Sequence, residues 1–213
     1  MDELAHELHT KPTSLVEKVE RLREDSLLSL SGERVDLNTR QRLLLAEKLI
    51  HDGRDPQKVS RYLEWQEFEN FAVATLGENG FRTAKHLVFK SRLGRREIDI
   101  VAWNDMFLLA IDCKHWLRGL SIGRMSVAAR AQVERMTALA GRPEILSRIG
   151  IDHVGKRSIM PAVFALGDSR HAFVDGVPIV SVSKLMSFLY GLSPFDERIC
   201  SIRVKEPVQL QLK

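Results

Sequence analysis

Apolar residues follow two different spacings along the chain, and the spacings predict its elements in order. Over 13–22, 39–53 and 65–79 they recur every three or four positions, which predicts amphipathic helices. Alternating or continuous apolar runs predict strands at 85–90, 97–103, 107–114, 158–166, 177–182 and 199–204, and helical spacing returns at 126–140 and after Ser183. This order predicts an α/β protein with a mixed central sheet flanked by helices and a small helical N-terminal region.

Two stretches qualify this pattern. Residues 27–37 are interrupted by Ser31-Gly32 and form either a small hairpin or a loop. The run at 158–166 is nearly all apolar, as in strands buried on both faces, but Pro161 predicts an edge position or a bulge near its start.

The N-terminal region has two interpretations. Asp55-Pro56 is typical of a helix start, so this helix and the one before it could form a helix-turn-helix, with Lys58, Ser60 and Arg61 as DNA contacts. The segment is slightly acidic and its turn is long, and a helical cap or dimerisation element explains the same periodicity. We favour the cap, and divide the chain into this region at 1–64, a main domain at 65–195, and a C-terminal strand and tail at 196–213.

The most informative stretch is the predicted hairpin at 97–114, which turns at Asn104-Asp105. Residues two apart on a strand share a face, so Asp112 and Lys114 lie side by side while Cys113 faces the other way. The hairpin can bring Asp99 next to Asp112. Charged groups are seldom buried unless they are paired or bound to metal, and carboxylate oxygens suit Mg²⁺ or Mn²⁺.

This hairpin resembles the PD-(D/E)xK nuclease superfamily, whose signature is an acid, a short hairpin and then acid-x-Lys. The matching residues are Asp99 and Asp112-Cys113-Lys114. Upstream, Phe68-Glu69, Leu76 and Gly80-Phe81 look like the first core helix of archaeal Holliday-junction resolvases and Mrr-type restriction enzymes, and downstream Gln132 lies where many members carry an active-site glutamine. The resemblance covers residues 65 to about 190. The chain departs from the family pattern at two places. No proline precedes Asp99, and Met136 stands where some members have the tyrosine of a Gln-x-x-x-Tyr motif that begins here at Gln132.

The resemblance implies a restriction-endonuclease-like fold and Mg²⁺-dependent hydrolysis of DNA, with Mn²⁺ as a substitute. Asp99, Asp112 and the Cys113 main-chain carbonyl would hold one ion, and Glu69 a second. Lys114 would position or deprotonate the attacking water, with Gln132 also in the site, and a homodimer would cut two strands. Two alternatives stand beside this: a noncatalytic DNA-binding module on the same scaffold, and a hairpin whose Asp112 and Lys114 form only an exposed ion pair, worth about 0–1 kcal/mol.

Charge supports an anionic partner. The chain has a net charge of +4, and residues 82–96 carry six Lys/Arg and no acid. Basic residues on both sides of the carboxylates would neutralise a polyanion held over a metal, although a solvated surface gives the same composition. The predicted DNA contacts are Arg92, Arg95, Arg96, Arg130 and Arg135. The sequence does not exclude RNA.

Composition also bears on location. No apolar run approaches the roughly 20 residues of a membrane span, and the first residues lack a signal-peptide pattern, so we expect a cytoplasmic protein without a membrane partner. The two cysteines, Cys113 and Cys200, make neither a disulfide framework nor zinc-ligand spacing.

Overall fold

The computed structural model describes the chain except residues 1–5, 7–8, 33, 55–58, 60–61, 93, 117–120, 152–156 and 204–213. It divides into two compact units, residues 1–68 and 69–213. The predicted helix start at Asp55-Pro56 and the candidate DNA contacts Lys58, Ser60 and Arg61 lie outside the described residues.

The first unit contains helix α2 (Pro12–Glu24), the hairpin β1 (Ser29–Ser31) and β2 (Arg34–Asp36), and helix α3 (Thr39–His51). The sequence is compatible with either a hairpin or a loop at 27–37, and the structure has the hairpin. Asn38 caps α3, because its Oδ1 accepts the Gln41 N–H at 2.9 Å while Gln41 Oε1 accepts the Asn38 N–H at 3.1 Å. The helix predicted over 13–22 begins one residue earlier, at Pro12, which needs no N–H partner at the first turn.

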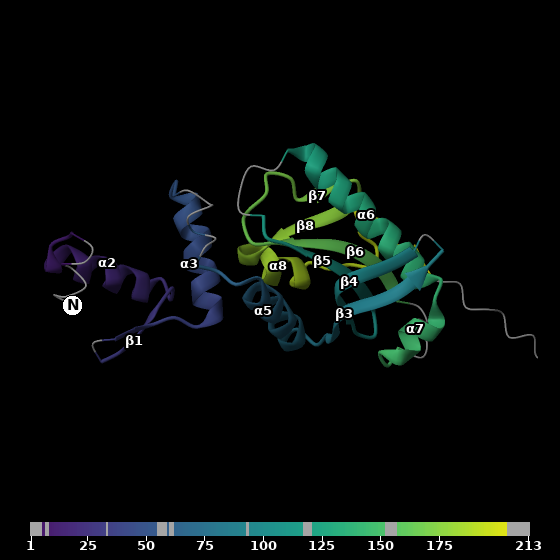
Figure 1. The fold of residues 1–213 in the computed structure, drawn as a ribbon, viewed down its shortest axis with the longest axis horizontal. Coiled ribbons are helices and arrows are strands. Elements are labelled where there is room, and N and C mark those ends of the chain that lie inside the picture. Colours follow the sequence, from purple (N-terminus) through teal and green to yellow (C-terminus); the bar gives the residue numbers. More distant parts are fainter. Residues whose placement is uncertain are drawn as a thin grey trace, which may run out of the picture. The chain divides into compact units, whose positions relative to one another are not determined.

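The second unit is built on a seven-stranded mixed sheet (Figure 1). Its main path runs β3-β4-β5-β6-β8-β7, and β9 pairs with β6. The strands are β3 (Arg82–Ser91), β4 (Gly94–Trp103), β5 (Phe107–Lys114), β6 (Ser158–Ala165), β7 (Phe173–Val174), β8 (Val177–Ser181) and β9 (Ile202–Arg203). Strands β3, β4 and β5 form an antiparallel meander, and β5, β6 and β8 are parallel. The predicted mixed α/β architecture is confirmed.

Helices cover both faces of this sheet. Helix α6 (Ile122–Ala140) crosses one face, where Met136 and Leu139 join a core cluster with Val101, Leu108 and Ala110 (Figure 1). On the other face Phe164 of β6 meets Phe188 of α8 (Leu185–Tyr190) edge-on, with ring centroids 6.1 Å apart. The remaining helices are α5 (Trp65–Glu78), which spans the boundary between the units, α7 (Pro143–Arg148) and the 3₁₀ turn η1 (Val182–Lys184). The sequence analysis missed α7, whose six residues are too short for a clear period.

None of the helices in the described part of the chain is long and apolar enough to cross a membrane.

The prediction that Pro161 marks an edge or a bulge is wrong. All eight residues of β6 are buried, and the strand lies inside the sheet beside β5. On its other side β6 pairs with β9 through Ser158 and Ile159 and with β8 from Val163 onward. Pro161 falls between these two ladders. On this side of β6 its missing N–H therefore removes no ladder hydrogen bond.

His86 interrupts the alternation of β3. Its φ is +52°, in the left-handed region, and it is the one position skipped in the pairing of β3 with β4 between Lys85↔Ile100 and Leu87↔Ile98. Ala84 and Leu87, three residues apart, both pack against the core cluster, whereas an undisturbed strand would place them on opposite faces. Ile98 and Val101 of β4, also three residues apart, pack in the same cluster, so both strands change phase beside His86, whose imidazole is half exposed.

Candidate active site

A buried carboxylate, Asp112, lies at the carboxyl end of β5. Only 3% of the residue is exposed. Lys114 Nζ lies 2.7 Å from its Oδ2, and Arg135 Nη1 of α6 donates to its Oδ1 at 2.9 Å. Two cations compensate one buried acid, which is the condition under which a charge is stable away from water.

Asp99 faces Asp112 across the hairpin. The register pairs Ile100 with Ile111, so one further step places the two aspartates opposite each other. Asp99 Oδ2 accepts the Cys113 N–H at 2.7 Å. Burial raises the pKa of Asp99, and the charges of Asp112 and Glu69 raise it further, against the opposing effects of that hydrogen bond and of Lys114. Among the described residues, the negative charge at Asp99 is therefore not fully compensated.

Glu69 of α5 approaches the same region through a histidine. It is 2% exposed, and its Oε2 lies 3.3 Å from His86 Nε2, while His86 Nδ1 lies 3.6 Å from Glu97 Oε1. The charge of Glu69 contributes to the raised pKa of Asp99, so the two carboxylates are neighbours. The sequence analysis missed His86. Strand alternation carries no signal for it, because its position depends on the left-handed backbone and on the approach of α5.

Gln132 and Arg135 extend the site from α6. They are one helical turn apart, and Arg135 Nη1 also donates to Gln132 Oε1 at 3.0 Å. Gln132 is completely buried, and among the described residues its Nε2 finds no acceptor. A buried donor without a partner costs about 1–3 kcal/mol, so this amide is suited to an acceptor that arrives with a ligand.

The predicted DNA contacts lie in three different places. Arg92 and Arg95 are exposed at the tip of the β3–β4 hairpin, and Arg96 is partly buried opposite Phe89. Arg130 donates to the Ser126 carbonyl at 3.3 Å and lies 3.8 Å from Asp175, outside the carboxylate cluster. Arg135 lies inside the cluster, where its partner is Asp112.

The side chains next to Lys114 are occupied with packing. Burial raises the pKa of the Cys113 thiol well above its ordinary value, and the charges of Asp99, Glu69 and Asp112 add to this. A reactive thiolate is therefore disfavoured at this buried cysteine. Trp116 packs, partly buried, against the cluster containing Met125 and Val163, and burial lowers the pKa of His115.

The donors suit a hard divalent cation only in part. Within the described ranges, no group of three or more His, Cys, Asp and Glu side chains is arranged to hold a metal ion. Asp99 and Asp112 nevertheless offer two adjacent carboxylates, and the uncompensated charge of Asp99 is one that a divalent cation would stabilise. Mg²⁺ commonly binds through one or two carboxylates and keeps several waters, a number of carboxylates that Asp99 and Asp112 supply.

Comparisons with known proteins identify a relative of this chain whose activity is uncharacterized. No family model matches the chain. An uncharacterized protein of Archaeoglobus fulgidus is 32% identical over 134 residues, which cover 61% of this chain and 92% of that protein. This chain belongs to the same family as that archaeal protein.

Two solved structures share part of the chain trace. The protein of unknown function AF1548 matches with a TM-score of 0.37 and 18% identity, over 56% of this chain and 65% of its own. The protein VC1899 from Vibrio cholerae matches with a TM-score of 0.36 and 15% identity, over 84% of this chain and 48% of its own. The chain thus spans less than two thirds of either structure.

Proposed function

We propose that this protein is a Mg²⁺-dependent endonuclease that hydrolyses DNA phosphodiester bonds. The observation that carries the proposal is the buried Asp112, with Lys114 Nζ 2.7 Å away on the same strand end and Asp99 on the neighbouring strand. The second alternative, in which Asp112 and Lys114 form only an exposed ion pair, does not fit an Asp112 side chain that is 4% exposed. A cytoplasmic homodimer that acts in repair, recombination or restriction belongs to the same proposal.

The residues of the carboxylate site divide the work of this mechanism among metal binding, water positioning and charge stabilisation. A divalent ion held by Asp99, Asp112 and the Cys113 carbonyl would supply Lewis-acid stabilisation and an activated water. Lys114 orients that water, or accepts its proton, and offsets negative charge that develops on the phosphorus oxygens. The Gln132 amide donates to a phosphate oxygen or the water, which satisfies its buried N–H. Glu69, held by His86, adds a third carboxylate at the edge of the site.

Cleavage is expected only with a metal that supports chemistry. Supercoiled plasmid, linear duplex, four-way junctions and RNA are incubated with the protein in Mg²⁺, Mn²⁺, Ca²⁺ or EDTA. We expect at least one DNA substrate to be cut with Mg²⁺ or Mn²⁺ and none with EDTA, with Ca²⁺ supporting binding without cleavage. DNA binding without cutting in any metal would replace the proposal by the noncatalytic module, and cleavage of RNA alone would change the substrate.

The hairpin tip is expected to supply phosphate contacts. Replacing Arg92, Arg95 and Arg96 together by alanine should weaken binding similarly for all DNA sequences, because phosphate contacts carry no base information. The logarithmic salt dependence of the binding constant should flatten by up to about 0.9 per lost duplex phosphate contact. The matched control is Arg198→Ala, since Asp196 already pairs with that guanidinium at 2.7 Å. An unchanged slope in the triple variant would show that the tip does not touch DNA.

A further inference from the structure

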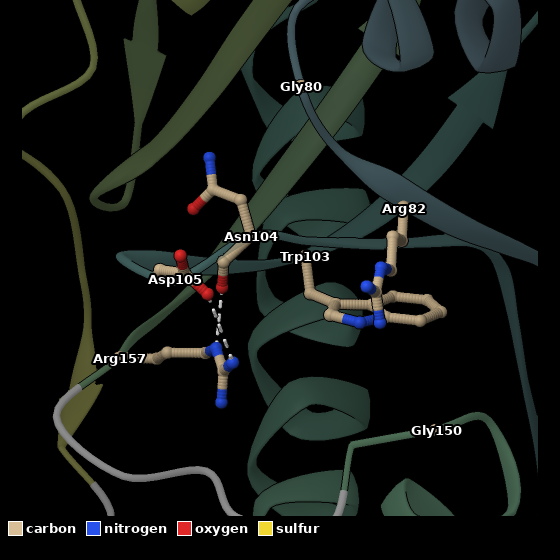
Figure 2. Close-up of a pocket in the computed structure, with 7 residues that line it drawn as sticks. All are labelled: Gly80, Arg82, Trp103, Asn104, Asp105, Gly150 and Arg157. Carbon is tan, nitrogen blue, oxygen red and sulfur yellow. Dashed lines mark hydrogen bonds and ion pairs between the residues drawn. The ribbon is translucent and has the colours of Figure 1, made fainter.

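A pocket lies at the carboxyl end of β4, beside Trp103 (Figure 2). It has a volume of about 270 Å³ and brings together the loop after α5, the start of β3, the end of β4 and its turn, and the segments after α7 and before β6. Its lining residues are Gly80, Arg82, Trp103, Asn104, Asp105, Gly150 and Arg157. None of them is used in the proposed nuclease chemistry.

The lining is rich in hydrogen-bond donors that lack acceptors. Arg82 pairs with Trp103 across the β3–β4 ladder, and Figure 2 shows its guanidinium beside the indole. Among the described residues, nothing accepts a hydrogen bond from the Arg82 guanidinium or from the Trp103 indole N–H. Trp103 is held rigidly, since the rest of its ring packs in the core cluster under α6. Two donors, one on a buried ring and one on an exposed side chain, thus lie at the pocket wall without a partner among the described residues.

Arg157 brings a second positive charge from the opposite wall. Its Nε donates to the Asn104 carbonyl at 2.5 Å, which fixes the guanidinium against the turn (Figure 2). The one acid of the lining, Asp105, is fully exposed and lies 3.9 Å from Arg157 Nη2. An ion pair so exposed contributes about 0–1 kcal/mol, so Asp105 does not cancel the charge of the arginines.

Backbone geometry keeps the pocket open. Gly80 and Gly150 have φ of +79° and +84°, in the left-handed region that L side chains rarely adopt. Glycine at both positions allows the chain to turn there and places no side chain on the rim. At about 270 Å³ the cavity lies just below the roughly 300–1,000 Å³ of small-ligand sites, and it is larger than one small inorganic ion needs.

We propose that this pocket binds a phosphate group carried on a pentose, with Arg82, the Trp103 indole N–H and Arg157 as donors to the phosphate oxygens. Two sources share this chemistry: a backbone phosphate of the DNA under cleavage, or a free mononucleotide. Trp103 lies four strand steps beyond Asp99, about 13 Å away, which a DNA strand bridges within a few nucleotides. Binding in this pocket does not require that the carboxylate site cuts DNA.

The indole N–H of Trp103 is the direct reporter of binding. The full chain is labelled with ¹⁵N-tryptophan, and its three indole signals are assigned by their loss in Trp65→Phe, Trp103→Phe and Trp116→Phe. Inorganic phosphate, thymidine 5′-monophosphate and a short oligothymidylate are titrated at constant ionic strength with EDTA present, so that no cleavage occurs. We expect the Trp103 signal to move and to saturate, while those of Trp65 and Trp116 stay in place.

Arg82→Gln removes the positive charge of a side chain that has no partner among the described residues, so the fold should tolerate it. The variant should bind the mononucleotide or the oligonucleotide about tenfold more weakly, the loss expected for one charge-assisted hydrogen bond. The matched control, Arg124→Gln on the exposed first turn of α6, should bind as the wild type does. Saturation at lower concentration by the oligonucleotide would assign the site to DNA, and at lower concentration by the mononucleotide to a free nucleotide.

Three results would overturn the inference. The Trp103 signal would stay fixed with every probe, or it would move equally with sodium chloride, or Arg82→Gln would bind as tightly as the wild type. Plasmid cleavage by Arg82→Gln is measured in parallel. If the wild type binds the probes but cuts no DNA in any metal, the nuclease proposal fails while the phosphate site stands.

Discussion

Asp99→Asn is expected to abolish DNA cleavage and Asp112→Asn to do the same, because each removes a charged oxygen ligand without changing side-chain size. Loss of one such ligand should cost several kcal/mol of charge stabilisation. Single-turnover cleavage by either variant above about one-tenth of the wild-type rate at saturating Mg²⁺ would place the metal elsewhere. The matched control is Glu134→Gln, which removes an exposed acid beside Arg135 and should cut DNA normally.

The two aspartate variants should differ in stability when metal is absent. Asp99→Asn should be at least as stable as the wild type, because it removes a charge that burial and two neighbouring carboxylates disfavour, and asparagine Oδ1 can still accept the Cys113 N–H. Asp112→Asn should be less stable, since Lys114 and Arg135 lose their ionised partner. Thermal unfolding in EDTA measures both, and the opposite order would contradict this account of the site.

The sign of the pH dependence follows from Asp99. Its pKa is raised in the folded protein, so the unfolded chain loses this proton more readily. The contribution of Asp99 to the free energy of unfolding should therefore fall as pH rises from its ordinary pKa to its folded pKa. Subtracting the Asp99→Asn profile, measured by denaturant titration in EDTA, isolates this contribution.

Lys114→Ala is expected to lower the rate of the chemical step by about 10²- to 10⁴-fold while metal and DNA binding persist. The fold should tolerate the change, because Arg135 still pairs with Asp112. The matched control is Lys184→Ala, which breaks a lysine–aspartate pair on the surface, with Nζ 2.7 Å from Asp168, and should leave the rate unchanged.

Lys114→Arg separates two roles. Arginine keeps a permanent charge but does not accept a proton, so an active variant would rule out the base role and leave charge stabilisation and water positioning. An inactive Lys114→Arg with intact metal and DNA binding would agree with proton transfer. Single-turnover rates near wild type for both the alanine and the arginine variants would remove Lys114 from the mechanism, and Asp112 and Lys114 would then be a structural ion pair.

Local sequence patterns were sufficient for the β4–β5 hairpin and for the candidate carboxylate pair. The two apolar runs within 97–114, separated by a turn at Asn104-Asp105, predict a hairpin. The two-residue period of side chains on a strand then places Asp112 and Lys114 on one face and Cys113 on the other. The position of Asp99 opposite Asp112 follows from the same hairpin, because a turn only a few residues away sets the register of the two strands. These inferences need only contacts between neighbouring strands.

Long-range packing decided the rest. Arg135 was predicted as a DNA contact, but the placement of α6 over the sheet gives it Asp112 as a partner. The contact of His86 with Glu69 requires a left-handed residue in β3 and a helix from an earlier segment. Pro161 is tolerated inside the sheet because two different strands share one side of β6. The pocket joins Arg82, Trp103 and Arg157, and no periodicity within one element relates residues from three separate segments.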